Sequence, residues 1–225
     1  MSFRDFGETE ERLYAFVRRT DGKLQLAYGV GAANTWTGDL GGPGGGTING
    51  HTAITYRDLN KRWIYFWTTS GGKLWTYHWN GTGWSWADLG QPSGTSLTTG
   101  APAAVTWTVN GERRQSVYVT ATNGNLYERQ WNGSSWVWIN HGKPSGVSSV
   151  SALSATVYRI PGAPASSTSV TPADIARHIF VRGNDGKLYV RWTLNDGSTW
   201  GWADQSAGAP ALGTGLTAAL AYFSR

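Results

Sequence analysis

Aromatic side chains recur beside polar ones along this chain of 225 residues, which contains 14 Trp and 10 Tyr. An aromatic face can carry the C–H side of a sugar ring, and nearby polar groups can bind the sugar hydroxyls. Each polar residue taken singly fits a solvated strand position, but their recurrence beside aromatic residues favours binding. We therefore expect aromatic-lined carbohydrate sites. Their candidate residues are Trp75, His78, Trp86, Tyr127, Glu128, Arg129, Trp138, Tyr189, Arg191 and Trp202.

These residues lie in four copies of one strand pattern. Each copy has an apolar strand, a glycine turn that ends in leucine, an aromatic strand and a strand with tryptophan. Asn-Gly and Asp-Gly dipeptides supply the positive φ angles of tight hairpins. The turn leucines recur about every 50 residues once an insertion at 161–176 is set aside, a period typical of propeller blades. The leucines are Leu24, Leu74, Leu126 and Leu188.

The pattern predicts an all-β protein, a β-propeller of four blades with four antiparallel strands each. We expect a single domain over residues 1–225, with repeats at about 3–51, 52–102, 103–153 and 154–217 and a closing strand at 218–225. One helical turn is expected at 172–177. Five segments resemble the strand nearest the propeller axis, one more than four blades require. Either the C-terminal strand closes the ring beside the N-terminal segment, or it joins a neighbouring subunit and forms a homo-oligomer.

Two sets of tryptophans are distinguished by their spacing. The first set, expected to pack the blades together, is Trp36, Trp84, Trp136 and Trp200. The second set follows two residues later and is expected to line pockets; it is Trp86, Trp138 and Trp202, with Gly38 in its place in the first repeat. Because the repeats differ at this position, we expect several shallow and unequal sites.

Composition excludes other classes of protein. The absence of Cys excludes disulfides and thiol chemistry, and the four His and 14 acidic residues are too scattered for a metal site or a glycosidase. We therefore expect no enzyme and no cofactor. The net charge is +5, but the basic residues do not form a run, so we expect no nucleic-acid partner. With neither a long apolar stretch nor a signal-peptide pattern, we expect a soluble protein that is cytoplasmic or secreted non-classically and does not insert into membranes.

The runs at 101–107, 119–124 and 126–136 resemble the repeat of bacterial propeller lectins typified by the Photorhabdus fucose-binding lectin. They are also similar to the fungal fucose lectins typified by the Aleuria lectin. The resemblance implies a non-catalytic lectin with sugar sites between adjacent blades, whose partners are mono- or oligosaccharides of glycoconjugates. Those relatives usually have six or seven blades.

The resemblance also implies a pocket with an arginine and, twelve residues later, a glutamate. Glu128 stands at the glutamate position, but Ser116 stands at the arginine position, and no repeat keeps the pair. Fucose recognition by this pair is therefore not expected, and the sugar stays open. The alternative is a protein- or polyanion-binding propeller, whose binding would fall steeply with salt. The corresponding pairs in the other repeats are Tyr14 and Leu26, Ile64 and Thr76, and His178 and Val190.

Overall fold

The computed structural model describes residues 2–3, 12–30, 33–58, 61–79, 83–162 and 169–208. Within these ranges the chain forms antiparallel strands and short 3-10 turns, so the predicted all-β class is confirmed. It divides into two compact units, Met1–Gln91 and Pro92–Arg225. In the described part of the chain, no helix has the length and apolar composition that crossing a membrane requires.

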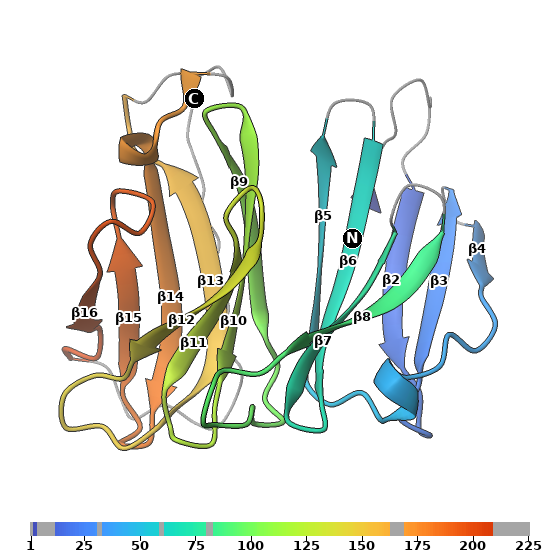
Figure 1. The fold of residues 1–225 in the computed structure, drawn as a ribbon, viewed down its shortest axis with the longest axis horizontal. Helices are drawn as coiled ribbons and strands as arrows, with labels where there is room; N and C mark the ends of the chain where they lie inside the picture. The colour runs from blue at the N-terminus through green and yellow to red at the C-terminus, as the bar shows by residue number, and fades with distance from the viewer. Residues whose placement is uncertain are drawn as a thin grey trace. The chain divides into compact units, whose positions relative to one another are not determined.

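The first unit contains two sheets of four antiparallel strands, each in chain order (Figure 1). Phe3 pairs with Arg12, so the N-terminal segment contributes the first strand of its sheet. A 3-10 turn, η1 (Pro43–Gly45), lies between the sheets in sequence. The strands are β1 (Ser2–Phe3), β2 (Arg12–Arg18), β3 (Leu24–Val30), β4 (Ala33–Trp36), β5 (His51–Asp58), β6 (Lys61–Ser70), β7 (Lys73–Trp79) and β8 (Trp84–Gly90).

The second unit also contains two four-stranded antiparallel sheets (Figure 1). The turn η3 (Pro172–Asp174) confirms the helical turn expected near residue 172, and Thr171 and Asp174 cap it reciprocally, whereas η1 was not expected. The strands are β9 (Ala103–Val109), β10 (Glu112–Thr120), β11 (Leu126–Trp131), β12 (Trp136–Gly142), β13 (Val150–Arg159), β14 (Ile175–Gly183), β15 (Leu188–Thr193) and β16 (Gly201–Asp204).

Each unit buries a hydrophobic core that draws on both of its sheets. In the first unit Leu24 and Phe66 are fully buried in one cluster. In the second unit Tyr118, Leu126 and Ile179 are equally buried in another. Burial of an apolar side chain of this size contributes about 1.5–3 kcal/mol. The alternation of residues along the strands therefore turns one face of each sheet toward its neighbour within the unit.

In each unit, a hairpin turn is held against the linker that leads to the next sheet. The N–H of Ile48 donates to the carbonyl of Gly22 at 2.8 Å, and the N–H of Val150 donates to the carbonyl of Gly124 at 3.1 Å. Both glycines have positive φ, 80° and 82°. This repeated contact fixes where each following sheet begins.

Each of the four sheets contains one of the four turn leucines, but one tryptophan was aligned wrongly. Trp36 ends β4 opposite Ala27, whereas Trp84 begins β8. The register of Trp36 is that of Trp86, which lies opposite Tyr77. The two residues also agree in spacing, since Trp36 follows its turn leucine Leu24 by twelve residues and Trp86 follows Leu74 by twelve. Trp36 therefore belongs to the second set of tryptophans. The single domain and the ring of four blades stay predictions, and the expected strand at 218–225 lies outside the described residues.

Candidate functional site

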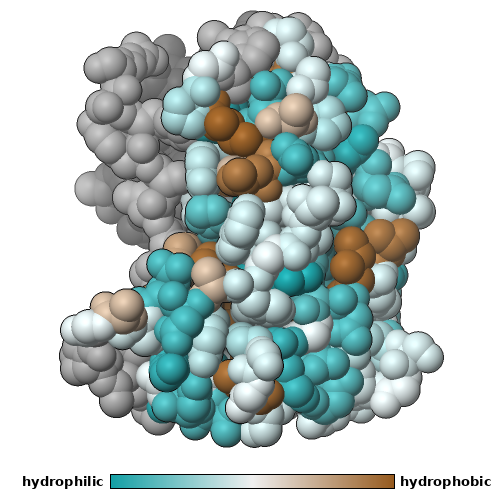
Figure 2. All heavy atoms as spheres, turned by 90° about the vertical axis from the view of Figure 1, so that its left-hand side faces the viewer, coloured by the Kyte–Doolittle hydropathy of each residue, from teal (hydrophilic) through white to brown (hydrophobic). Residues whose placement is uncertain are grey.

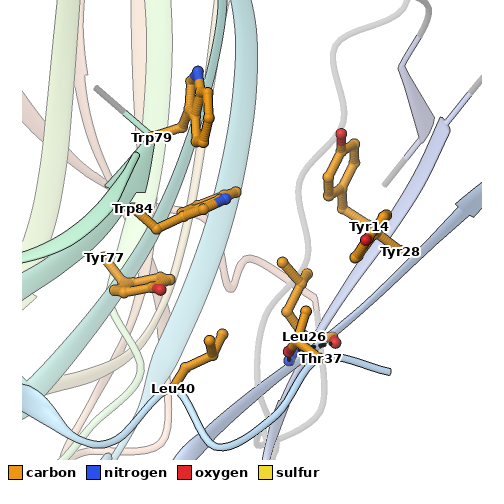
Figure 3. A pocket seen from close by; sticks show the side chains of 8 residues that line it. All are labelled: Tyr14, Leu26, Tyr28, Thr37, Leu40, Tyr77, Trp79 and Trp84. Carbon is orange, nitrogen blue, oxygen red and sulfur yellow. Dashed lines mark hydrogen bonds between the residues drawn. The ribbon is translucent and has the colours of Figure 1, made fainter. Parts of the chain in front are cut away.

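A pocket with a volume of about 410 Å³ lies between the two sheets of the first unit (Figure 3). One side is formed by β7 and β8, and the opposite side by β2, β3 and the segment that follows β4. The lining side chains of Tyr14, Leu26 and Tyr77 are buried, while Tyr28 at the rim is 40% exposed. The lining residues are Tyr14, Leu26, Tyr28, Thr37, Leu40, Tyr77, Trp79 and Trp84.

Stacked rings build the β7–β8 wall of this pocket. The rings of Tyr77 and Trp84 lie 5.2 Å apart and within 10° of parallel. Trp79 pairs with Trp84 across the two strands and meets it at 5.9 Å and 64°. Tertiary contacts fix the wall because Trp84 also packs on the core cluster around Leu24 and Phe66. The result is a preformed aromatic surface of the kind that a sugar ring can cover.

The polar groups of the pocket are neutral. Its lining contains three tyrosines, two indoles and one threonine, and no charged side chain. The Thr37 hydroxyl donates to the Leu26 carbonyl at 2.9 Å and accepts from the Leu26 N–H at 3.2 Å. Burial raises the pKa of Tyr77, which keeps its hydroxyl protonated. This chemistry suits an uncharged ligand that has both an apolar face and hydroxyl groups.

In the second unit a buried ionic cluster stands at equivalent positions. Strand register places Glu128 where Leu26 lies in the first unit and Ser116 where Tyr14 lies. Arg177 is 1% exposed, and its guanidinium donates to Glu128 Oε1 at 2.6 Å and to Ser116 Oγ at 3.3 Å. The Ser116 hydroxyl also donates to Glu128. The side chain of Arg177 thus fills the space beside these two positions in the second unit.

Further contacts enclose the Arg177 guanidinium. It lies 4.7 Å from the centre of the Trp107 ring and 4.8 Å from that of Trp200. It also donates to the Asp196 carbonyl at 3.0 Å, and Glu128 Oε2 lies 2.8 Å from His141 Nε2. Among the described residues, no group of three or more His, Cys, Asp or Glu is placed to hold a metal ion.

Two carboxyl groups of this cluster have pKa values shifted in opposite directions. Burial by itself would raise the pKa of Glu128, but the charge of Arg177 and the bonds from His141 and Ser116 hold it at about 2. Burial raises the pKa of Asp196 to about 6, although Arg177 opposes the shift. The protonated form of Asp196 is therefore the one that favours folding, and its contribution is lost as the pH rises through 6.

We expect Glu128 to make the stability depend on pH in the acid range. Because its pKa is about 2 in the folded protein against an ordinary 4.5, its stabilising contribution is complete above pH 4.5 and is lost as the pH falls toward 2. The free energies of unfolding of the wild type and of Glu128→Gln should differ most above pH 4.5, and the difference should shrink on acidification. Urea unfolding at a series of pH values measures it. A constant difference down to pH 2 would contradict the assignment.

The candidate residues predicted on β7 and β8 occupy separate environments. Trp75 packs on the turn η1, where a Cβ at Gly44 would lie 3.0 Å from its ring. His78 stacks on Tyr65 at 5.4 Å. Trp86 donates its indole N–H to the Leu40 carbonyl at 3.0 Å. None of these three candidates is among the residues that line the pocket.

The candidates of the second unit fall into three kinds of contact. Tyr127 and Tyr189 are tied to their own hairpin turns, since Tyr127 accepts from Asn123 and Tyr189 donates to Asp185. Glu128 is fully buried in the ionic cluster. The other four residues form arginine–tryptophan contacts; they are Arg129 with Trp138 and Arg191 with Trp202.

Sequence reasoning did not select the residues that line the pocket. Tyr77 occupies the same place relative to its turn leucine as Arg129 and Arg191. Comparing these three positions in the sequence could therefore have identified Tyr77 as a candidate. Trp84 was expected to pack blades; it does pack on the core, and it also lines the pocket. Trp86, which was expected to line a pocket, packs edge-on against Phe66 at 6.3 Å.

Solved structures with a similar arrangement of strands include AofleA from Arthrobotrys oligospora, over 90% of this chain with 18% identity and a TM-score of 0.61. A lectin from Burkholderia pseudomallei is similar over 84% of the chain, with 20% identity and a TM-score of 0.57. The fungal lectin of Aleuria aurantia, a six-bladed β-propeller, is similar over 97%, with 15% identity and a TM-score of 0.59. This chain shares their fold.

The likeness concerns the fold, because sequence identity is low in every comparison. The chain spans 55%, 50% and 65% of the lengths of these three structures. No protein-family model matches it, and no curated protein matches it. The recognition of propeller lectins from the repeats is confirmed at this distant level.

Proposed function

We propose that this protein is a non-catalytic carbohydrate-binding protein whose four sheets are the blades of a β-propeller. The observation that carries the proposal is the pocket of the first unit, where a stacked aromatic wall faces neutral hydroxyl groups. Such a wall covers the apolar face of a sugar ring, and the phenol and indole groups at its edge bind hydroxyls. Its ligands are mono- or oligosaccharides of glycoconjugates.

Solved structures with a similar fold support this class of ligand. The lectin SapL1 was solved with α-methyl fucoside, and the Aleuria aurantia lectin is described by its mode of fucose recognition. In this chain Tyr14 and Leu26 line the pocket, so a charged arginine–glutamate pair does not hold the sugar there. We infer that the pocket binds a neutral sugar mainly by ring stacking, and that its affinity depends little on salt.

Additional shallow sites are proposed at the arginine–tryptophan contacts of the second unit. Sites of unequal structure in one chain would each bind weakly, and together they would raise the avidity for a glycan-coated surface by about 10²–10⁴. The buried Arg177 cluster is not proposed as a sugar site, since Arg177 and Glu128 are 1% and 0% exposed.

Replacing Trp84 by alanine should abolish glycan binding at the pocket, because the replacement removes half of the stacked wall. Trp84 also packs on the core, so Tyr28→Ala at the exposed rim serves as a second variant that spares stability. Val17→Ala is the control in the same unit, since Val17 is 39% exposed and lies outside the pocket lining. A glycan array, followed by titration of the best neutral ligand, measures all three.

The expected pattern is loss of binding in Trp84→Ala, at least about tenfold weaker binding in Tyr28→Ala, and wild-type binding in Val17→Ala. If no glycan binds the wild type, the proposed function is wrong. If glycans bind and both pocket variants retain full affinity, the pocket is not the site.

A further inference from the structure

One position differs in charge between the two units. The residue opposite the tryptophan of the outermost strand is Tyr77 in sheet β5–β8, where it lines the neutral pocket. At the same position Arg129 lies opposite Trp138 in sheet β9–β12, and Arg191 lies opposite Trp202 in sheet β13–β16. Both sheets of the second unit therefore present a guanidinium at this position, whereas sheet β5–β8 presents a phenol and sheet β1–β4 presents Ala27.

Both guanidinium groups lie on indole faces. Arg129 Cζ is 5.1 Å from the centre of the Trp138 ring. Arg191 Cζ is 5.4 Å from that of Trp202 and 5.6 Å from that of Trp200. Cation–π attraction at these distances holds each planar guanidinium in a set orientation. Part of the entropy that an arginine loses when it binds an anion has thus been lost in advance.

Neither guanidinium has a counter-ion in the described ranges. Other arginines pair with carboxylates, for example Arg114 with Glu112 at 3.0 Å and Arg177 with Glu128 at 2.6 Å. Among the described residues, no carboxylate lies within 4.0 Å of Arg129 or Arg191, and the Nε atom of each is buried without a hydrogen-bond partner. Burial lowers the pKa of both. An incoming anion would offset the cost of leaving these partly buried cations unpaired.

We propose that Arg129 with Trp138, and Arg191 with Trp202, bind the carboxylate or sulfate group of an acidic glycan. The proposal rests on the carbohydrate-binding function above, because the indole beside each guanidinium would contact the sugar ring. A sugar is favoured over a long polyanion for two reasons. Each arginine lies on its own tryptophan, and the basic residues behind the net charge of +5 do not form a run. On the face of the molecule toward β15 and β16, hydrophobic residues form only small separate patches (Figure 2).

Three matched probes test the proposal: an oligosaccharide ending in glucuronic acid, its carboxyl-reduced counterpart ending in glucose, and the latter sulfated at O6. The 225-residue protein should bind the two acidic probes at least about tenfold more tightly than the reduced probe at low salt. This preference should decrease as salt screens the charges. The carboxylated and sulfated probes show which anion the sites prefer.

Arg191→Gln and Arg129→Gln should each reduce the preference for acidic probes, and the double variant should abolish it. Arg→Lys at the same positions should restore part of it, because the charge returns without the planar fork. Lys187→Gln is the matched control, since it removes one positive charge from an exposed side chain on the sheet of Arg191. Thermal melting verifies that each variant is folded.

Two results would overturn this inference while leaving the proposed function intact: equal affinity for acidic and reduced probes, or an acidic preference that survives in the double variant. If single-stranded nucleic acid binds through the same arginines more tightly than the acidic oligosaccharides, the assignment to glycans is wrong. If no probe binds and the neutral array is also empty, the proposed function itself fails.

Discussion

Arg177→Ala should lower the free energy of unfolding by about 3–5 kcal/mol, the usual cost of leaving one member of a buried ion pair without its partner. Arg177 and Glu128 are 1% and 0% exposed, and Arg177 also lies between the rings of Trp107 and Trp200. The replacement leaves the Glu128 carboxylate buried beside Ser116 without its cation. Denaturant unfolding followed by tryptophan fluorescence measures the loss.

Two further variants separate the ion pair from other effects of Arg177→Ala. The double variant Arg177→Met, Glu128→Leu should be more stable than Arg177→Ala, because apolar residues of similar volume often replace a buried pair at little cost. Lys187→Ala should change stability little, since its pairing with Asp204 at 3.0 Å is exposed. A double variant less stable than Arg177→Ala would show that the ion pair does not dominate the cost.

Gly124→Ala should also strongly destabilise the second unit. Gly124 has a φ of 82°, and a Cβ there would overlap the carbonyl oxygen of Ser148 and lie 3.0 Å from the Cα of Ser149. Both neighbours belong to the linker that precedes β13, so backbone must move to make room. We expect a loss of more than about 1 kcal/mol, the usual cost of positive φ for alanine, and a marked fall in Tm.

Gly146→Ala is the matched control for this prediction. Gly146 has a φ of 79°, but no atom lies within 4 Å of its Cβ position. This variant therefore shows the cost of positive φ without the collision. Equal Tm values for the two variants would mean that the linker does not press on the hairpin turn as the structure indicates.

Local patterns in the sequence predicted the strands, because strand alternation and turn glycines depend on residues close together in the chain. The all-β class, the four four-stranded sheets and the turn at Pro172–Asp174 follow from these patterns. The error at Trp36 arose because the tryptophans were matched by order and not by distance from the turn leucine. Trp36 and Trp86 each follow that leucine by twelve residues, and the backbone pairing places them alike, opposite Ala27 and Tyr77.

The sites depended on contacts that local patterns do not contain. Position in the repeat identified Glu128 and Arg191 as polar residues near aromatic ones, but it did not distinguish their surroundings: Arg191 lies over the Trp202 ring, whereas Glu128 is buried in an ionic cluster. Only tertiary structure decided that Arg177, 49 residues further along the chain, pairs with Glu128 and fills the space there. It also decided that Trp84 lines an open pocket. The sequence determined which residue types recur on each face of a strand. The packing of one sheet on the next determined which of these recurring positions line a pocket and which are buried in a core.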